Sequence, residues 1–244
     1  MPRPNEFSRQ PFVILALPRT GSTLLTQLLD SHPRITCYNE PFNPNAVYAA
    51  DKTLKTERMR AYRDEDPVGF TELLYSVDGA ERVVGFKILE YQARDVQDHL
   101  LLRRDIRKVI LRRDNLLASY SSNLMAIKVR QWGLGAGDQA RKTTIEFNYR
   151  KFDDYLGRTA QYYRHVNGLI ESSGSPMMAL EYQELISHEV QKRLLAFLGA
   201  DPTCKLKARI KRQNPGSLRT RFSNWDQVVT DLSGTSMEEW LQGE

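Results

Sequence analysis

The chain has 244 residues, of which 41% are hydrophobic and 27% are charged. This length favours one large domain, and the composition argues against a chain that is disordered or a coiled coil throughout. Cys37 and Cys204 are the two cysteines, which argues against a disulfide scaffold, a zinc ribbon or an iron–sulfur cluster. The net charge of +5 indicates an anionic partner, such as a nucleic acid, an acidic surface or a phosphorylated cofactor.

The apolar runs and the first residues of the chain bear on membrane insertion and targeting. The longest strongly apolar run, residues 12–17, is too short to cross a bilayer, so we expect no membrane span. The residues after Met1 lack the apolar region of a signal peptide. We therefore expect a cytoplasmic protein.

Short β-rich runs alternate with helical patterns along the chain. Strands are predicted at residues 12–17, 82–88, 108–111 and 176–180, and each is followed by a predicted helix, at residues 22–29, 91–101, 115–127 and 187–198. Further helices are predicted at about 143–171, 225–232 and 237–241. Strand–helix alternation predicts an α/β fold: a central parallel sheet flanked by helices on both faces, with ligands at the carboxyl ends of the strands.

The segment after the first predicted strand has the pattern of an anion site. It reads Pro18-Arg19-Thr20-Gly21-Ser22-Thr23 and leads into a helix. Such a turn directs backbone N–H groups and a helix N-terminus at one point. An ordinary capped helix start is the alternative. We expect a bound anionic group to contact Arg19, Thr20, Gly21, Ser22, Thr23 and Leu24.

The main rival is a nucleoside triphosphate site. A kinase P-loop has the pattern GxxxxGK[ST], and it needs an acidic residue at a neighbouring strand end to hold magnesium. Here the first glycine and the lysine are missing, and the strand at 108–111 is followed by Arg112 and Arg113. A kinase and a non-enzymatic anion or nucleic-acid binder remain the alternatives. Aromatic side chains interleaved with basic ones are not evident, so we expect no nucleic-acid partner.

A second basic motif follows the strand at 108–111. Arg113 lies at the strand end, and Ser121 lies about two helical turns up the following helix. Together with the PRTGST loop, this pair resembles the sulfotransferases that use 3′-phosphoadenylyl sulfate (PAPS). In that family the first loop holds the 5′-phosphosulfate and the Arg–Ser pair holds the 3′-phosphate. The Lys-x-Gly-Thr-x-Trp and GxxGxWK motifs of the cytosolic aryl and steroid enzymes are absent, so the chain resembles the carbohydrate, glycolipid and tyrosylprotein branch.

The resemblance extends to weaker segments. Tyr182, in Glu181-Tyr182-Gln183-Glu184-Leu185, resembles a family tyrosine near the 3′-phosphate, and Lys211 and Asn214 lie in a segment that resembles the family's closing segment over the cofactor. The resemblance implies one sulfotransferase-like domain with a P-loop NTPase-like fold over residues 1–244. We expect a flexible N-terminus at 1–10 and a cofactor-covering segment at about 205–244.

Sulfuryl transfer to a hydroxyl needs a base and a cation to stabilise the transferred group. The resemblance implies Glu40, in a Glu-Pro-Phe context, as the base, and His32 is its rival. Arg19 and Lys87, at the end of the second predicted strand, are the expected catalytic cations. No His, Cys, Asp or Glu cluster has metal-ligand spacing, so no metal is expected.

The predicted reaction moves a sulfuryl group from PAPS to a hydroxyl and leaves 3′,5′-ADP. The resemblance implies a carbohydrate, glycolipid or small-metabolite acceptor. Its pocket is expected from residues 43–76 and 128–147, and the glycine-rich stretch at 131–137 reads as a lid or a plain connector. Whether the protein is a homodimer is left open.

Overall fold

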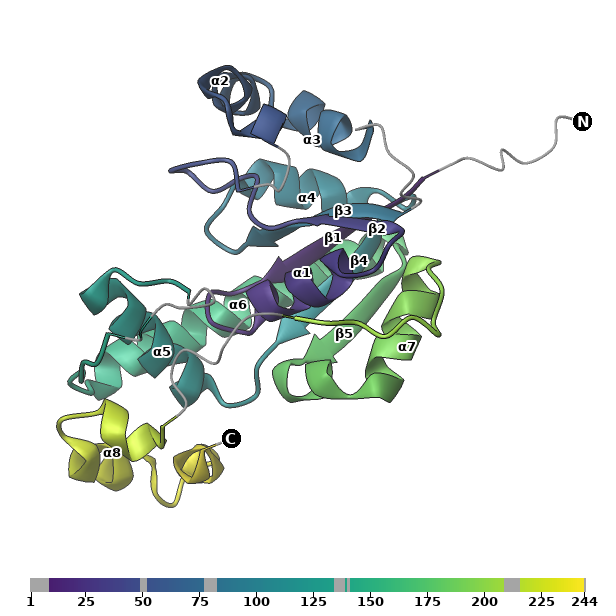
Figure 1. Cartoon of the computed structure of the whole chain (residues 1–244). Coiled ribbons are helices and arrows are strands. Elements are labelled where there is room, and N and C mark those ends of the chain that lie inside the picture. The colour runs from purple at the N-terminus through teal and green to yellow at the C-terminus, as the bar shows by residue number, and fades with distance from the viewer. Residues whose placement is uncertain are drawn as a thin grey trace, which may run out of the picture.

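The computed structural model describes residues 9–48, 52–76, 83–133, 139, 141–208 and 216–243. Five strands form one parallel sheet in the order β2-β3-β1-β4-β5 (Figure 1). The strands are β1 (Gln10–Ala16), β2 (Ile35–Tyr38), β3 (Val83–Leu89), β4 (Arg107–Arg112) and β5 (Met177–Glu181). The predicted fold class, a parallel sheet between helices, is confirmed.

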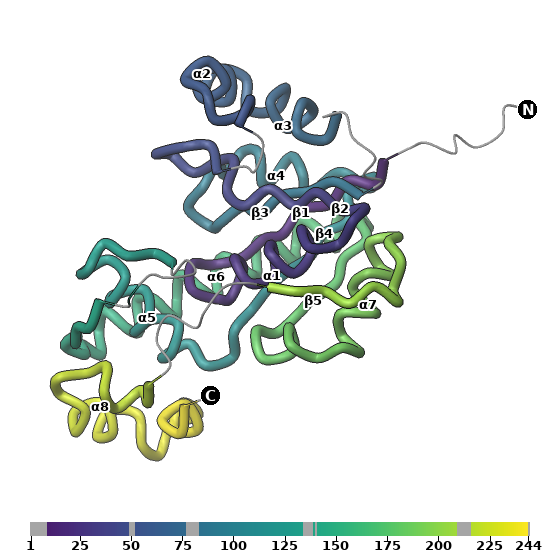
Figure 2. Tube along the Cα trace, viewed as in Figure 1, coloured from purple at the N-terminus to yellow at the C-terminus, as the bar shows by residue number. Residues whose placement is uncertain are grey.

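Helices cover both faces of this sheet (Figures 1 and 2). The helices are α1 (Ser22–Asp30), α2 (Glu57–Glu65), α3 (Pro67–Ser76), α4 (Arg94–Leu102), α5 (Leu116–Val129), α6 (Tyr149–Ser173), α7 (His188–Leu198) and α8 (Trp225–Leu232). Short 3-10 turns are η1 (Lys52–Lys55), η2 (Tyr182–Ile186), η3 (Leu218–Arg221) and η4 (Glu238–Gln242). Helices α1 and α7 pack on one face, and α3, α4 and α6 pack on the other.

The core is centred on β1. Its residues from Phe12 to Ala16 are fully buried, as expected for the middle strand of a sheet covered on both faces. A third apolar cluster joins α5 and α6 to the C-terminal elements η3, α8 and η4. In Figure 2, α5 and α8 lie beside each other, away from α2 and α3. The C-terminal elements therefore pack on α5.

The structure differs from the predicted elements at several points: helices α2 and α3 were not predicted, and the helix expected at 237–241 is the 3-10 turn η4. Strand β2 was not predicted, because a four-residue strand is too short to show a hydrophobic period. The long helix begins at Tyr149, where the Asn148 side chain caps it, rather than near residue 143. Ile145 instead forms an isolated bridge with Phe222, which joins the segment before α6 to the C-terminal segment.

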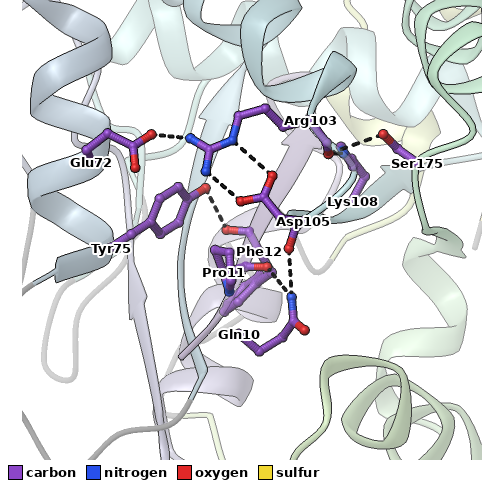
Figure 3. Close-up of polar contacts among 9 residues, drawn as sticks. All are labelled: Gln10, Pro11, Phe12, Glu72, Tyr75, Arg103, Asp105, Lys108 and Ser175. Atoms are coloured by element: carbon purple, nitrogen blue, oxygen red, sulfur yellow. Dashed lines mark hydrogen bonds and ion pairs between the residues drawn. The ribbon is translucent and has the colours of Figure 1, made fainter. Parts of the chain in front are cut away.

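A polar cluster closes the amino edge of the sheet (Figure 3). The Arg103 guanidinium makes ion pairs with Glu72 of α3 and with Asp105. The Tyr75 hydroxyl donates to the Phe12 carbonyl at 3.2 Å, and the fully buried Lys108 donates to the Arg103 carbonyl. Each charged group there is paired or hydrogen-bonded, so this edge is a structural closure of the fold.

In the part of the chain that the structure describes, no helix is both long enough and apolar enough to cross a membrane.

Candidate active site

The opposite edge, at the carboxyl ends of the strands, gathers most of the predicted site residues. They come from the β1–α1 loop and the start of α1, the loop after β2, β3 itself, the β4–α5 segment and the turn after β5; these residues are Arg19–Thr23, Glu40, Lys87, Arg113, Ser121 and Tyr182. Parallel strands end at a common edge, so their following loops converge there. Lys211 and Asn214 lie outside the described residues.

The β1–α1 loop is shaped as an anion cradle. Arg19 and Gly21 have φ angles of 67° and 84°, and the buried Thr20 hydroxyl donates to the Leu17 carbonyl at 2.8 Å. Gly21 is the N-cap of α1 and makes no side-chain capping bond. The first N–H groups of a helix have no intrahelical acceptor, so this helix start can donate to an anionic group.

Arg19 ties this loop to distant parts of the chain. Its Nε donates to Ser122 Oγ at 2.9 Å, and its Nη1 donates to the Trp132 carbonyl at 2.7 Å. Burial, and then the neighbouring Arg113 cation, lower the pKa of Arg19 to about 10. The guanidinium therefore stays charged at neutral pH. An anion nearby would relieve its repulsion with Arg113.

Arg113, Tyr182 and Gly21 pack as one unit. Arg113 Nη1 donates to the Arg19 carbonyl at 2.8 Å, and its guanidinium carbon lies 4.6 Å from the centre of the Tyr182 ring. A Cβ on Gly21 would come within 2.3 Å of Tyr182 Cδ2. The tyrosine therefore sits directly on the loop, between it and the strand-end arginine.

Ser121 lies on the buried side of α5. It contacts Arg221, a residue that the sequence analysis did not single out. Arg221 Nη1, from η3, donates to Ser121 Oγ at 3.2 Å, and Ser121 Oγ donates to the Ala118 carbonyl at 3.1 Å. Arg221 is 4% exposed. The sequence signal was the basic C-terminal segment, but nothing in the sequence singles out which of its cations turns inward.

Glu40 and Lys87 form a buried ion pair. Lys87 Nζ lies 2.9 Å from Glu40 Oε1 and donates to Thr23 Oγ1 at 3.1 Å. Burial raises the pKa of Glu40, but the Lys87 cation and three hydrogen bonds outweigh it and hold that pKa below its ordinary value. Burial lowers the pKa of Lys87, and Glu40 opposes this shift. The pair joins the carboxylate to the first turn of α1.

The loop that carries Glu40 is fixed by groups that the sequence did not indicate. Glu40 Oε2 accepts from Asn43 Nδ2 at 2.8 Å and from Gln92 Nε2 at 2.9 Å. The buried Arg63 of α2 donates to the carbonyls of Pro41 and Asn43 at 3.2 and 2.6 Å. The contacts of Gln92 and Arg63 link residues far apart in the chain, and no local spacing predicts them.

His32, the rival base, lies at the wrong edge of the sheet. It follows α1 and precedes β2, so it sits at the amino ends of the strands. The ring is 3% exposed, and its Nδ1 accepts the backbone N–H of Arg34 at 3.1 Å. The other predicted position that turns away is Leu24, which packs against the core cluster between α1 and α7.

A pocket of about 320 Å³ lies beside the Glu40 loop, within the segment expected to contact an acceptor. Its walls are residues 45–48, residues 55–57 and Arg60. The backbone of Glu40 pairs with that of Tyr48, whose side chain is 46% exposed. Residues 134–138 of the glycine-rich stretch lie outside the described residues.

The described side chains contain no group of three or more His, Cys, Asp or Glu placed to hold a metal ion.

Comparison with known proteins agrees with this geometry. Residues 11–111, from β1 through most of β4, match the model of the sulfotransferase family. The sulfotransferase from Alicyclobacillus acidocaldarius shares the fold, with a TM-score of 0.50 and 18% identity over 95% of this chain and 92% of that one. The family match over residues 11–111 and the relatives described below support a sulfotransferase enzyme.

Two curated relatives are similar over nearly their whole length. Nodulation protein H of Rhizobium tropici is 28% identical over 236 residues, which cover 93% of this chain and 91% of the relative. Nodulation protein H of Rhizobium meliloti (strain 1021) is 27% identical over 236 residues, covering 90% of each chain.

Proposed function

We propose that the protein transfers a sulfuryl group from PAPS to an acceptor hydroxyl and uses Glu40 as the base. The observation that carries this proposal is the position of Lys87, whose ammonium contacts both the Glu40 carboxylate and Thr23 at the start of α1. A carboxylate, a buried cation and an anion-binding helix start thus meet at one point. This is the set of groups that the reaction requires.

The donor site fits a cofactor with two separated anionic groups. The β1–α1 loop offers helix N–H groups and Arg19 for a 5′-phosphosulfate. For a 3′-phosphate we propose Arg113, together with Ser121 and the Arg221 that contacts it. We include Tyr182 in this site because its ring packs between Gly21 and Arg113. When bound, PAPS supplies the activated sulfuryl group.

The roles of the chain's own groups follow from their contacts. Glu40, whose pKa is held below its ordinary value, is ionised at neutral pH and can accept the proton of a hydroxyl. Lys87 and Arg19 are buried or half-buried cations, and they stabilise negative charge in surroundings of low dielectric. Lys87 also orients the carboxylate that it contacts.

The acceptor is proposed to bind between the Glu40 loop and the turn after β3. Tyr48 and Tyr91, 46% and 54% exposed, offer aromatic surface near Glu40, and the pocket lined by residues 45–48, residues 55–57 and Arg60 offers polar and charged walls. Aromatic walls with a few polar groups are typical of small-molecule sites. We propose a carbohydrate, glycolipid or small metabolite that carries a hydroxyl.

Calorimetric titration with 3′,5′-ADP, in parallel with ATP, tests the donor. Each titration is run with magnesium and with EDTA. We expect 3′,5′-ADP to bind tightly in both buffers and ATP to bind weakly. Magnesium-dependent binding of ATP, without binding of 3′,5′-ADP, would contradict the proposal and favour a nucleoside triphosphate enzyme.

A further inference from the structure

The three donors around Glu40 are unevenly distributed over its two oxygens. Oε2 accepts from Asn43 at 2.8 Å and from Gln92 at 2.9 Å. Oε1 meets Lys87 at 2.9 Å. A carboxylate oxygen accepts two hydrogen bonds, so Oε2 is full. Within the described ranges, Oε1 keeps one accepting position.

The orientation of the Gln92 amide is determined by its contacts. The side chain is 1% exposed, and its carbonyl oxygen accepts the backbone N–H of Leu89 at 3.1 Å. The amide nitrogen must therefore face Glu40, and it also lies 3.3 Å from the Tyr91 hydroxyl. Gln92 holds the carboxylate from a fixed position in the turn after β3.

A second buried amide, that of Gln97 on α4, holds the backbone of this turn. Gln97 Nε2 donates to the carbonyls of Gln92 at 2.5 Å and Leu89 at 3.1 Å, and Gln97 Oε1 accepts the Tyr162 hydroxyl at 3.0 Å. Gln97 and Tyr162 are 1% and 3% exposed. A continuous set of buried hydrogen bonds thus runs from α6, through α4 and the turn, to Glu40.

The backbone next to Gln92 is strained. Ala93 has a φ angle of 36°, in the left-handed region that favours glycine. Such a conformation in another residue persists only where the surroundings impose it. The buried, hydrogen-bonded amides of Gln92 and Gln97 lie on either side of Ala93 in the chain, and we attribute the conformation to their contacts.

We propose that Gln92 is a positioning residue that fixes Oε2 of Glu40 and so assigns Oε1 as the atom that takes the acceptor's proton. The inference rests on the proposed function of Glu40. The hydroxyl O–H bond breaks, its electron pair stays on the acceptor oxygen, and the proton forms a new O–H bond at Oε1. Other titratable groups near this carboxylate include Lys87, Tyr91 and Tyr48.

The test compares Gln92→Met, which keeps the side-chain length but removes the amide, with the wild type. Gln191→Met is the matched control. Gln191, on α7, is also buried, and its amide nitrogen donates to the backbone carbonyl of Leu185. The pKa of Glu40 is measured by carbon-13 NMR on protein labelled at glutamate carboxyls, with Glu40→Gln to assign the signal. Two further measurements are 3′,5′-ADP affinity and the consumption of PAPS with water as acceptor.

Three results are expected for Gln92→Met. The pKa of Glu40 rises, because a hydrogen bond to the ionised form is lost. PAPS consumption falls about tenfold, because the carboxylate is no longer held in one orientation and this loss outweighs its greater basicity. The affinity for 3′,5′-ADP stays within about twofold, since Gln92 does not touch the donor site. Gln191→Met leaves the pKa of Glu40 unchanged.

Failure of this inference can be told from failure of the proposed function. An unchanged pKa of Glu40, or an unchanged rate, in Gln92→Met while Glu40→Gln is inactive would remove the positioning role alone. Wild-type PAPS consumption by Glu40→Gln would remove the proposed base instead. Should Gln92→Met fail to fold, Gln92→Asn shortens the amide but keeps it polar, and we expect smaller changes in the same directions.

Discussion

Lys87 of β3 and Glu40 of the loop after β2 form an ion pair, with Lys87 Nζ 2.9 Å from Glu40 Oε1. The Lys87 side chain is 1% exposed and the Glu40 side chain 15%. Removing one member of such a pair leaves an uncompensated charge in the protein interior. The same contact is therefore expected to matter for stability as well as for chemistry.

Lys87→Met is expected to lower the free energy of unfolding by about 3–5 kcal/mol, because it leaves the Glu40 carboxylate without its counter-ion. Glu40→Gln should also destabilise the protein, because it leaves the buried Lys87 ammonium without a counter-ion and turns an amide N–H₂ toward one of the three donors. The double variant should cost less than the sum of the two by about 0.5–3 kcal/mol. Urea unfolding of all four proteins measures this coupling, and strictly additive losses would show that the pair does not interact in solution.

Glu40→Gln is expected to reduce sulfuryl transfer by about 10²–10⁴, the usual contribution of a general base. Because the amide is nearly isosteric, 3′,5′-ADP should bind the variant as it binds the wild type. Rates with PAPS and calorimetry measure the two effects. Glu171→Gln, on the exposed face of α6, is the control and should keep full activity. Normal turnover in Glu40→Gln would exclude this residue as the base.

Ser121→Ala is expected to weaken 3′,5′-ADP binding about tenfold while leaving the affinity for 5′-AMP unchanged, because only 3′,5′-ADP carries the 3′-phosphate. Ser172→Ala is a close control. Its hydroxyl also donates to the carbonyl three residues earlier in a helix, but on the exposed surface of α6. If both ligands weakened equally, Ser121 would act on the nucleoside or the fold rather than on the 3′-phosphate.

Gly21→Ala is expected to destabilise the protein by at least about 1–2 kcal/mol, because an alanine at a φ angle of 84° is strained and its Cβ would meet Tyr182. Displacement of that ring should also weaken 3′,5′-ADP binding. Gly168→Ala, in the exposed middle of α6 with open space around it, should instead stabilise by about 0.5–1 kcal/mol. Thermal unfolding with and without 3′,5′-ADP compares the two variants. Unchanged stability in Gly21→Ala would contradict the close packing of Gly21 against Tyr182.

Glu181→Gln is expected to stabilise the protein at pH 8 but not at pH 5. Burial, and then the Asp114 carboxylate beside it, raise the pKa of Glu181 from 4.5 to about 7. The folded state therefore binds the proton more tightly than the unfolded state, and stability is lost as pH rises from about 4.5 through 7. Gln stays neutral and should abolish this loss. Urea unfolding across this range is the measurement, and parallel curves for both proteins would refute the shift.

The sequence predicted the central elements because their signals are local. The apolar run of β1 and the glycine turn at Gly21 indicate a buried strand followed by a helix start, and the structure has both. The spacing from Arg113 to Ser121 is also a local signal in the sequence. These motifs lie where a parallel sheet brings loops together, so the location of the site followed from the element pattern.

The supporting contacts could not be predicted. Gln92 meets Glu40 through the pairing of β2 with β3, and β2 was too short to recognise. The inward turn of Arg221 depends on the packing of η3 against α5. In each case an ordinary polar residue takes its role from a tertiary contact, which leaves no periodicity or spacing in the sequence.

The position of β1 in the sheet has a consequence for synthesis on the ribosome. Its hydrogen-bonding partners are β3 and β4, and the first paired residue of β3 is Val83. The most apolar segment of the chain therefore emerges about seventy residues before any neighbouring strand exists to pair with it. We expect that truncated chains ending before β4 expose this strand and aggregate, and that slow closure of these distant pairings limits the folding rate.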